Sequence, residues 1–397
     1  MERHASGAAD RVRWARAAAF AAPAATAAWR AAGSFTRLAD ASRPTLTALG
    51  LSPAFLAQLE AARHCEAQDL RWLEQPGHTL VLRSDPDYPP LLATLPEAPF
   101  ALWVRGTVSA LRAPQVAVVG SRRATATGRE LATEFAEALA TAGWTVTSGL
   151  AEGIDAAAHR GALRAAVGTP CATTLAVCGT GPDQHYPRHH GALADQIAAA
   201  GAVVTEFPPG TPARPAHFPY RNRILAGLSL ATVVIEAAVR SGSLVTARLA
   251  AEQGREVYAV PGSVRNPAAR GCHALLRDGA RLVENATDVL NELKFSSLLA
   301  AGMTATPQPR AVPASQANPP LLSAPRLDRE AEILLDALGY EATDVDTLVS
   351  RTGLPPSAVS TQLLLLELRG MVEPRAGGKY ARLASLPGAA GCVPTAH

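Results

Sequence analysis

Between residues 116 and 293, short apolar runs alternate with longer helical patterns, and this alternation restricts the chain to a small set of folds. The expected strands are Val116–Val119, Thr145–Ser148, Thr174–Val177, Val203–Glu206, Ala231–Ile235 and Val257–Val260. Helices are expected between most of them, at 128–142, 153–166, 188–200 and 243–253. Alternating strands and helices predict a parallel sheet covered by helices on both faces, which is an α/β fold.

The first strand leads into a turn that predicts an anion site. Gly120 and Ser121 end the apolar run, and a helix-forming sequence begins near Gly128. Unpaired amide groups at a helix N-terminus favour an anion, and the planar side chains of Arg122 and Arg123 suit phosphate. We therefore expect phosphate in this turn, on the amides of residues 120–122.

A second loop has a similar design. The strand Ala231–Ile235 is followed by Ser241, Gly242 and Ser243, which precede a helix. Small residues let a ligand approach the backbone, and the helix N-terminus again favours an anion. The alternative is an ordinary turn with Ser243 as the helix N-cap, and this loop alone favours that alternative.

The segment HFPYRNRILAGLS combines aromatic and basic residues. Phe218 and Tyr220 stand just before Arg221, Asn222 and Arg223. Arginines contact phosphates and aromatic rings stack on unpaired bases, so this mixture is typical of single-stranded nucleic-acid binding. A surface loop with chance arginines explains the segment equally well in isolation.

Other candidate groups favour structural roles. Asp155 and His159 are four residues apart on one expected helix and could support acid–base chemistry, but a packed, structural pair is the preferred interpretation. His185, His189 and His190 have passable ligand spacing. No cysteine or carboxylate pattern completes a metal site, so surface histidines are expected and no metal is predicted.

Common cofactor motifs are absent. The chain has no GxxxxGK(S/T) motif, and CGTGPD supplies Gly179 and Gly181 without the third glycine of a dinucleotide site. We therefore expect no cofactor.

The net charge is only +3, so any basic surface must be local. Five cysteines without a CxxC pair indicate free thiols in a reducing cytoplasm.

The sequence near the N-terminus imitates a signal peptide. Arg11, Arg13 and Arg16 precede an alanine-rich run, but the weak hydrophobicity of this run favours a helix. No apolar run is long enough to span a membrane.

The sequence divides into five predicted parts. They are an N-terminal helical domain at 1–84, a core at 85–295, a proline-rich linker at 296–325, a winged helix at 326–385 and a tail at 386–397.

Taken together, several blocks of the sequence closely resemble the DNA-processing protein A (DprA/Smf) family. The blocks are VGSRRATATG, SGLAEGIDAAAHRGAL, GTGPDQHYP, TEFPPG, FPYRNRILAGLS and EAAVRSGSLVTARLAAEQGREVYAVPG. The resemblance implies an extended Rossmann-like core that binds single-stranded DNA without sequence preference. It also implies a dimer that acts in natural transformation, protects incoming strands and helps to load the RecA recombinase.

The resemblance assigns three segments to one phosphate pocket. The family's GSR arginine falls on Arg122, its RNR segment on residues 221–223 and its SGS loop on residues 241–243. The family's N-terminal helix-hairpin-helix glycines are missing here, and AAPAAT stands about where they would be. His190 replaces a common asparagine, and Thr127 a frequent aromatic residue.

Two other functions compete with a non-enzymatic DNA binder. A nucleotide or glycosidic-bond hydrolase on the same fold typically carries a PGGxGT loop followed by a glutamate, whereas this chain reads RSGSLVTA with Glu236 before it. A transcriptional regulator would act through residues 326–385. Its expected recognition helix, SAVSTQLLLLELRG, carries little charge before Arg369, which favours a partner or regulatory module.

Overall fold

The computed structural model of the chain describes residues 2–165 and 173–293 and, toward the C-terminus, residues 334–335, 337–338, 343–368, 371–375 and 379–382. It separates into two compact units, Met1–Pro307 and Gln308–His397. The predicted linker and tail lie outside the described residues.

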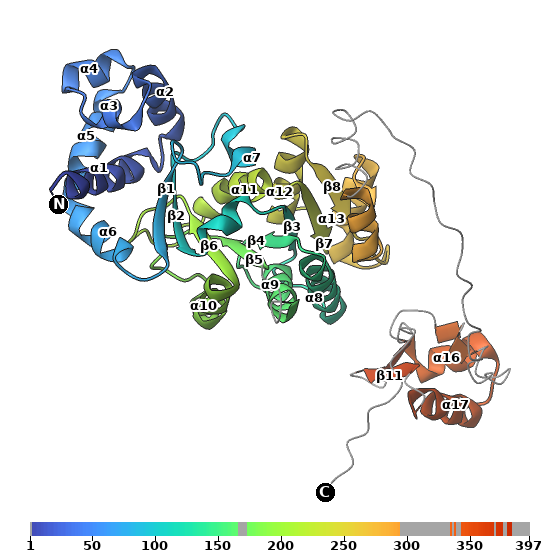
Figure 1. Cartoon of the computed structure of the whole chain (residues 1–397). Helices are drawn as coiled ribbons and strands as arrows, with labels where there is room; N and C mark the ends of the chain where they lie inside the picture. The colour runs from blue at the N-terminus through green and yellow to red at the C-terminus, as the bar shows by residue number, and fades with distance from the viewer. Residues whose placement is uncertain are drawn as a thin grey trace, which may run out of the picture. The chain divides into compact units, whose positions relative to one another are not determined.

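The first unit is built on a nine-stranded sheet with the strand order β1-β2-β6-β5-β4-β3-β7-β8-β9 (Figure 1). The strands are β1 (His78–Leu82), β2 (Ala101–Gly106), β3 (Gln115–Gly120), β4 (Thr145–Ser148), β5 (Thr174–Val177), β6 (Gly201–Thr205), β7 (Ala231–Ile235), β8 (Glu256–Ala259) and β9 (Arg281–Leu282). Neighbouring strands from β6 to β9 are parallel. The predicted parallel α/β core is confirmed, and β4, β5 and β7 have the predicted bounds.

One edge of the sheet differs from the expectation. β2 pairs antiparallel with β6, and β1 pairs antiparallel with β2. The strand β1 was not predicted, because its short HTLVL run is not followed by the helix that marks a strand–helix unit. The predicted domain boundary after residue 84 therefore lies between two strands that pair in one sheet.

Helices cover both faces of the sheet (Figure 1). One layer contains α8 (Ala126–Thr141), α9 (Ile154–Ala165), α10 (Gly191–Ala200) and a helix over 286–293, and the other contains α7 (Pro90–Ala93), α11 (His217–Leu228), α12 (Gly242–Glu252) and α13 (Arg270–Arg277). Side chains of β3 alternate between the layers, since successive residues of a strand point to opposite faces. Val118 packs with α8 and α9, and Val119 packs in the layer of α11 and α12.

The helix α11 corrects the picture of a surface loop with chance arginines. Residues 221–228 of this helix are all buried, and Ile224 and Leu225 pack in the core between sheet and helices. Pro219 lies in the first helical turn, where a missing amide is tolerated. The arginines of this segment therefore lie on a buried helix.

Six α-helices among the described residues precede the sheet and belong to the same unit. Trp14, Phe55 and Trp103 are among the side chains that join these helices to β1 and β2 in one core. Pro44 and Pro53 lie in the first turns of two of them, where the missing proline amide is tolerated. The helices are α1 (Glu2–Ala18), α2 (Ala22–Ala32), α3 (Phe35–Ala39), α4 (Arg43–Ala48), α5 (Pro53–Ala61) and α6 (Glu66–Leu73).

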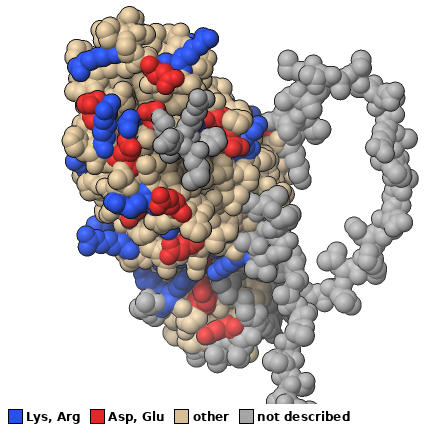
Figure 2. All heavy atoms as spheres, turned by 60° about the vertical axis from the view of Figure 1, so that its left-hand side comes forward, with Lys and Arg blue, Asp and Glu red and all other residues tan. Residues whose placement is uncertain are grey.

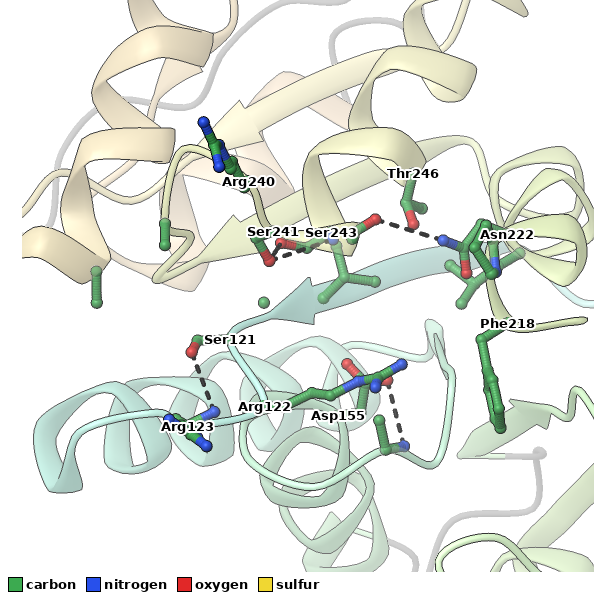
Figure 3. Close-up of a pocket in the computed structure, with 18 of the residues that line it drawn as sticks. Ser121, Arg122, Arg123, Asp155, Phe218, Asn222, Arg240, Ser241, Ser243 and Thr246 are labelled. Atoms are coloured by element: carbon green, nitrogen blue, oxygen red, sulfur yellow. Dashed lines mark hydrogen bonds between the residues drawn. The ribbon is translucent and has the colours of Figure 1, made fainter. Parts of the chain in front are cut away.

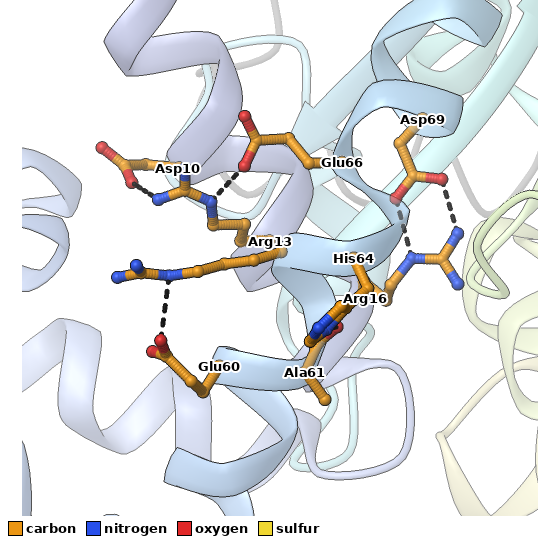
Figure 4. A network of polar contacts seen from close by, with 9 residues as sticks. Asp10, Arg13, Arg16, Glu60, Ala61, His64, Glu66 and Asp69 are labelled. Carbon is orange, nitrogen blue, oxygen red and sulfur yellow. Dashed lines mark hydrogen bonds and ion pairs between the residues drawn. The ribbon is translucent and has the colours of Figure 1, made fainter.

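Arg13 and Arg16 of α1 form ion pairs with carboxylates of the protein. Arg13 pairs with Asp10 and Glu66, and Arg16 pairs with Asp69 at 2.5 Å (Figure 4). On the face in Figure 2, positive and negative side chains are likewise interspersed. None of the described helices is long and apolar enough to cross a membrane.

The second unit has the predicted order of helices followed by a hairpin. Its described elements are β10 (Thr343–Asp344), α16 (Val345–Thr352), α17 (Pro356–Leu368), β11 (Val372–Arg375) and β12 (Lys379–Arg382). The three strands form an antiparallel sheet in the order β10-β12-β11. Leu348, Leu363 and Val372 share a small core, and this arrangement is the expected winged helix.

Candidate functional site

A cavity of about 640 Å³ opens at the carboxyl ends of β3 and β7. The chain runs from β3 through β4 and β5 to β6 on one side, and then returns to β7 on the other side of β3. The two neighbouring strands β3 and β7 therefore lead into helices on opposite faces of the sheet. Open α/β folds bind ligands at such a switch point.

The loop after β3 forms one wall of the cavity. The Ser121 amide donates to the carbonyl oxygen of Glu236 at 2.6 Å, and any side chain on Gly120 would collide with the Ile235 carbonyl group. This close approach of the two strand ends needs a glycine. Arg122 and Arg123 follow with exposed side chains, and the Arg122 guanidinium lies 5.6 Å from the ring centre of Phe218.

The helix N-terminus in this loop is occupied by a side chain of the protein. The Glu236 carboxylate accepts hydrogen bonds from the amide of Thr125 at 2.8 Å and from its hydroxyl at 2.5 Å. The Thr125 hydroxyl in turn accepts from the Gly128 amide. Glu236 has a positive φ of 51°, a conformation that surrounding contacts must maintain. The anion seat predicted at this helix is therefore filled by a carboxylate, and the Ser121 amide is also engaged.

The loop after β7 is more open. Ser241, rather than Ser243, is the N-cap of α12, and its hydroxyl accepts from the Ser243 amide at 3.4 Å. A Cβ atom on Gly242 would meet nothing within 4 Å, so its backbone borders empty space. Arg240, just before this turn, is exposed and lines the cavity. Figure 3 shows Ser241 and Ser243 on the opposite side of the cavity from the β3 loop.

The helix α11 closes the cavity with buried polar groups. Arg221 is 5% exposed. Its Nη1 donates to the Gly149 carbonyl at 2.5 Å and to the Val177 carbonyl. Asn222 donates to the Gly242 carbonyl at 3.4 Å, which connects α11 to the start of α12. Arg221 thus connects α11 to the ends of β4 and β5 at the cavity wall.

A buried carboxyl group lies beside Arg221. Asp155 lines the cavity at the start of α9. Burial raises the pKa of this carboxyl, while the positive charge of Arg221 opposes the rise. Burial lowers the pKa of Arg221, and Asp155 opposes that shift in the same way. The two groups stabilise each other's charged forms in a site that water reaches poorly.

Arg223 is the one predicted site residue that does not line the cavity. It is 6% exposed and forms an ion pair with Glu206 at 2.5 Å. Its guanidinium also lies 4.2 Å from the ring centre of Tyr220. Burial raises the pKa of Glu206 to about 7 against the opposing charge of Arg223. On a helix, residues two apart face different directions, so Arg221 and Arg223 do not point into the same cavity.

The remaining candidates have structural environments. His159 is fully buried, and its Nδ1 lies 2.7 Å from the Thr174 hydroxyl. Burial lowers the pKa of His159 to about 3, so its ring is neutral. His190 corrects the expectation of a surface histidine, because it is buried with Nδ1 3.0 Å from the Leu150 carbonyl. Within the described residues, no group of three His, Cys, Asp or Glu side chains could hold a metal ion.

Nine of the ten predicted site residues meet at the cavity. They are Gly120, Ser121, Arg122, Phe218, Arg221, Asn222, Ser241, Gly242 and Ser243. Sequence reasoning missed Arg240 and Thr246, although both line the cavity together with Arg123. Arg240 could have been predicted as a site residue from the sequence, since it directly precedes the small-residue turn at residues 241–243.

The charge of the cavity is strongly positive. Four arginines line it, and Asp155 is its one acidic lining residue. Within the described part of the chain, Arg122, Arg123 and Arg240 form no ion pair with a carboxylate. The low-dielectric walls concentrate this positive potential. The cavity therefore suits an anionic ligand that also offers a surface to Phe218.

Comparison with known proteins identifies related sequences and related structures. Residues 79–294 match the family model described as DNA recombination-mediator protein A, and residues 313–378 match the DprA winged helix domain. Protein Smf of Escherichia coli is 43% identical over 315 residues, which span 79% of this chain and 80% of that protein. DNA processing protein DprA of Streptococcus pneumoniae is 42% identical over 211 residues, or 53% of this chain and 73% of the relative. The X-ray structure of DprA from Streptococcus pneumoniae aligns with a TM-score of 0.61 and 33% identity, covering 68% of this chain and 92% of that one.

Proposed function

Because the chain belongs to the DNA recombination-mediator protein A (DprA/Smf) family, we propose that it binds single-stranded DNA in the cavity between β3 and β7. The observation that carries this proposal is the position of Arg122. Its exposed guanidinium has no carboxylate partner among the described residues and lies 5.6 Å from the Phe218 ring centre. In single-stranded nucleic-acid sites, a cation contacts the phosphate and an aromatic ring beside it stacks on the unpaired base.

In this proposal, phosphates bind to Arg122, to Arg240 and to the open amide of Gly242. Guanidinium groups bind phosphate through paired N–H donors, and an amide at a helix N-terminus adds a further donor. The other predicted residues shape this surface. Gly120 and Ser121 bring the β3 and β7 ends together, and Ser241 and Ser243 order the turn.

The buried polar residues of α11 support the site in this proposal. Arg221 and Asn222 fix the cavity wall without releasing their hydrogen bonds to the backbone, and Arg221 adds positive charge. Arg223 supports α11 from the opposite side through Glu206. Phosphate binding is assigned to exposed arginines because a buried, hydrogen-bonded guanidinium would have to break its existing contacts first.

The preference for single strands follows from the aromatic ring. Phe218 is half-buried in the cavity wall, and only a base released from pairing can present its face to such a ring. Phosphate contacts and stacking are both insensitive to base identity. We therefore expect binding without sequence preference.

The proposed biological role follows from the family resemblance. The chain would act in natural transformation by protecting incoming strands and helping to load RecA, as a homodimer in the cytoplasm and without an enzymatic activity. The winged helix would serve a partner or regulatory function. In α17, Glu367 is the one charged residue between Pro356 and Leu368, which offers little to a duplex major groove.

A direct test compares single-stranded and double-stranded oligonucleotides of equal length at two salt concentrations. The single strand should bind more tightly, and its affinity should fall as salt rises because bound phosphates release counterions. Equal or tighter duplex binding, or affinity independent of salt, would contradict the proposal. Incubation with nucleoside monophosphates followed by chromatography tests the hydrolase alternative, for which base release is the expected result.

A further inference from the structure

Tyr186 lies outside the cavity but in contact with one of its walls. It follows β5 and precedes the short 3-10 helix Arg188–His190, in a loop at the edge of the sheet where the cavity opens. Its ring centre lies 4.9 Å from that of Phe218, with the ring planes tilted by 45°. The side chain is 48% exposed. A large aromatic side chain that is packed on one side and open on the other is a stacking platform.

The contacts of Phe218 explain why Tyr186 is the more accessible ring. Phe218 has the Arg122 guanidinium at 5.6 Å and Tyr186 against it. A Cβ atom on Gly179 would lie only 3.2 Å from the Phe218 ring, so this glycine leaves room for the ring. Arg122, Phe218 and Tyr186 form a continuous row that begins in the cavity and ends at the exposed tyrosine.

We propose that Tyr186 stacks on a nucleobase of the strand whose phosphates occupy the cavity, one step outside the site of Arg122. This inference rests on the proposed function and adds a second base position to it. Successive bases of a single strand stack on successive aromatic rings in such sites. Phe218 contacts both Arg122 and Tyr186, and the exposed ring of Tyr186 receives the second base.

The test uses two substitutions that separate stacking from packing. Tyr186→Phe keeps the aromatic ring, and Tyr186→Leu keeps apolar contact with Phe218 but removes the π face. Affinity is measured by fluorescence anisotropy with oligothymidylate and with an abasic strand of the same length. Because stacking contributes about 1–3 kcal/mol per base, Tyr186→Leu should weaken oligothymidylate binding by roughly 5- to 150-fold.

Three further results are expected if the inference is correct. Tyr186→Leu binds the abasic strand as the unmodified protein does, because its phosphate contacts are intact. The slope of log affinity against log salt stays the same for this variant. Tyr186→Phe binds both strands like the unmodified protein.

Two outcomes would overturn the inference while leaving the proposed function in place. One is equal weakening of both strands by Tyr186→Leu, which assigns the residue to packing. The other is an unchanged Tyr186→Leu alongside loss of binding in Arg122→Ala. If the unmodified protein binds neither strand, the proposed function fails and the inference fails with it.

Discussion

The arginines of the β3 loop and those of α11 lie close together in the fold but have opposite surroundings. Arg122 and Arg123 are exposed and pair with no carboxylate among the described residues. Arg221 and Arg223 are buried; Arg221 donates to the backbone carbonyls of Gly149 and Val177, and Arg223 is paired with Glu206. A buried charge without a partner costs several kcal/mol, so the α11 arginines are bound to the protein and the loop arginines remain available to a ligand.

This contrast separates two functions that the same residue type has in one site. Substitution of the α11 arginines should lower the stability of the fold, and substitution of Arg122 in the β3 loop should lower ligand affinity. All five tryptophans belong to the first unit. Denaturant unfolding followed by tryptophan fluorescence therefore reports on the stability of the unit that contains the cavity.

The largest effect is expected for Arg221→Met. The substitution removes the donor to Gly149 and Val177 and takes the positive charge of Arg221 away from Asp155. Loss of one partner of a buried charged pair costs about 3–5 kcal/mol, and the free energy of unfolding should fall by that amount. Arg123→Met, at an exposed position, is the control and should change it by less than about 0.5 kcal/mol. Equal stability of the two variants would remove the proposed contrast.

A somewhat smaller effect is expected for Arg223→Met. This change leaves Glu206 buried and unpaired, at a cost of about 3 kcal/mol. Combining it with Glu206→Gln removes the unpaired charge, so the double variant should regain at least about 1 kcal/mol of stability. Chemical denaturation of the two variants measures the difference. A double variant that is no more stable than Arg223→Met would show that the ion pair is not what supports α11.

The pH dependence of stability gives a third test of the buried side. Burial lowers the pKa of His159 to about 3, whereas the unfolded chain takes up this proton near pH 6.5. The stabilisation is fully present above pH 6.5 and is lost as the pH falls toward 3. Below pH 6.5 it should decrease by about 1.4 kcal/mol per pH unit, or by about 2 kcal/mol between pH 7 and pH 5.

The matched variant is His159→Gln, which has no titrating group at this position. Denaturant unfolding at pH 7 and pH 5 should show a smaller loss of stability in this variant than in the unmodified protein. The same pH dependence in both proteins would mean that His159 does not remain neutral in the folded state.

The sequence predicted that the strand-end segments converge, but it did not predict which of their arginines are exposed and which are buried. The strand-end segments converge because the carboxyl ends of parallel strands meet at one edge of the sheet, and the period of the apolar runs located those strands. The burial of Arg223 depends on Glu206, which the sheet order brings beside α11 from the end of β6. A pairing of this kind has no local signal.

The helix N-terminus at Thr125 illustrates the same limit. The sequence correctly indicated a turn and a helix start that favour an anion. The anion that fills it is Glu236, 111 residues away, and only the pairing of β3 with β7 makes the contact possible. Local patterns predicted the type of site, and long-range contacts decided which of its donors remain open.

The most direct test of the account is the binding of single-stranded DNA by Arg122→Ala at several salt concentrations, with Arg123→Ala as the neighbouring control. Hydrogen bonds to charged groups contribute about 1.5–3 kcal/mol, so Arg122→Ala should weaken binding by roughly 10- to 150-fold. The slope of log affinity against log salt should become shallower by about 0.7, while the free energy of unfolding stays within about 0.5 kcal/mol of the unmodified value. Arg122→Ala that binds single strands with unchanged affinity and an unchanged salt slope would contradict the assignment of this cavity to the DNA backbone.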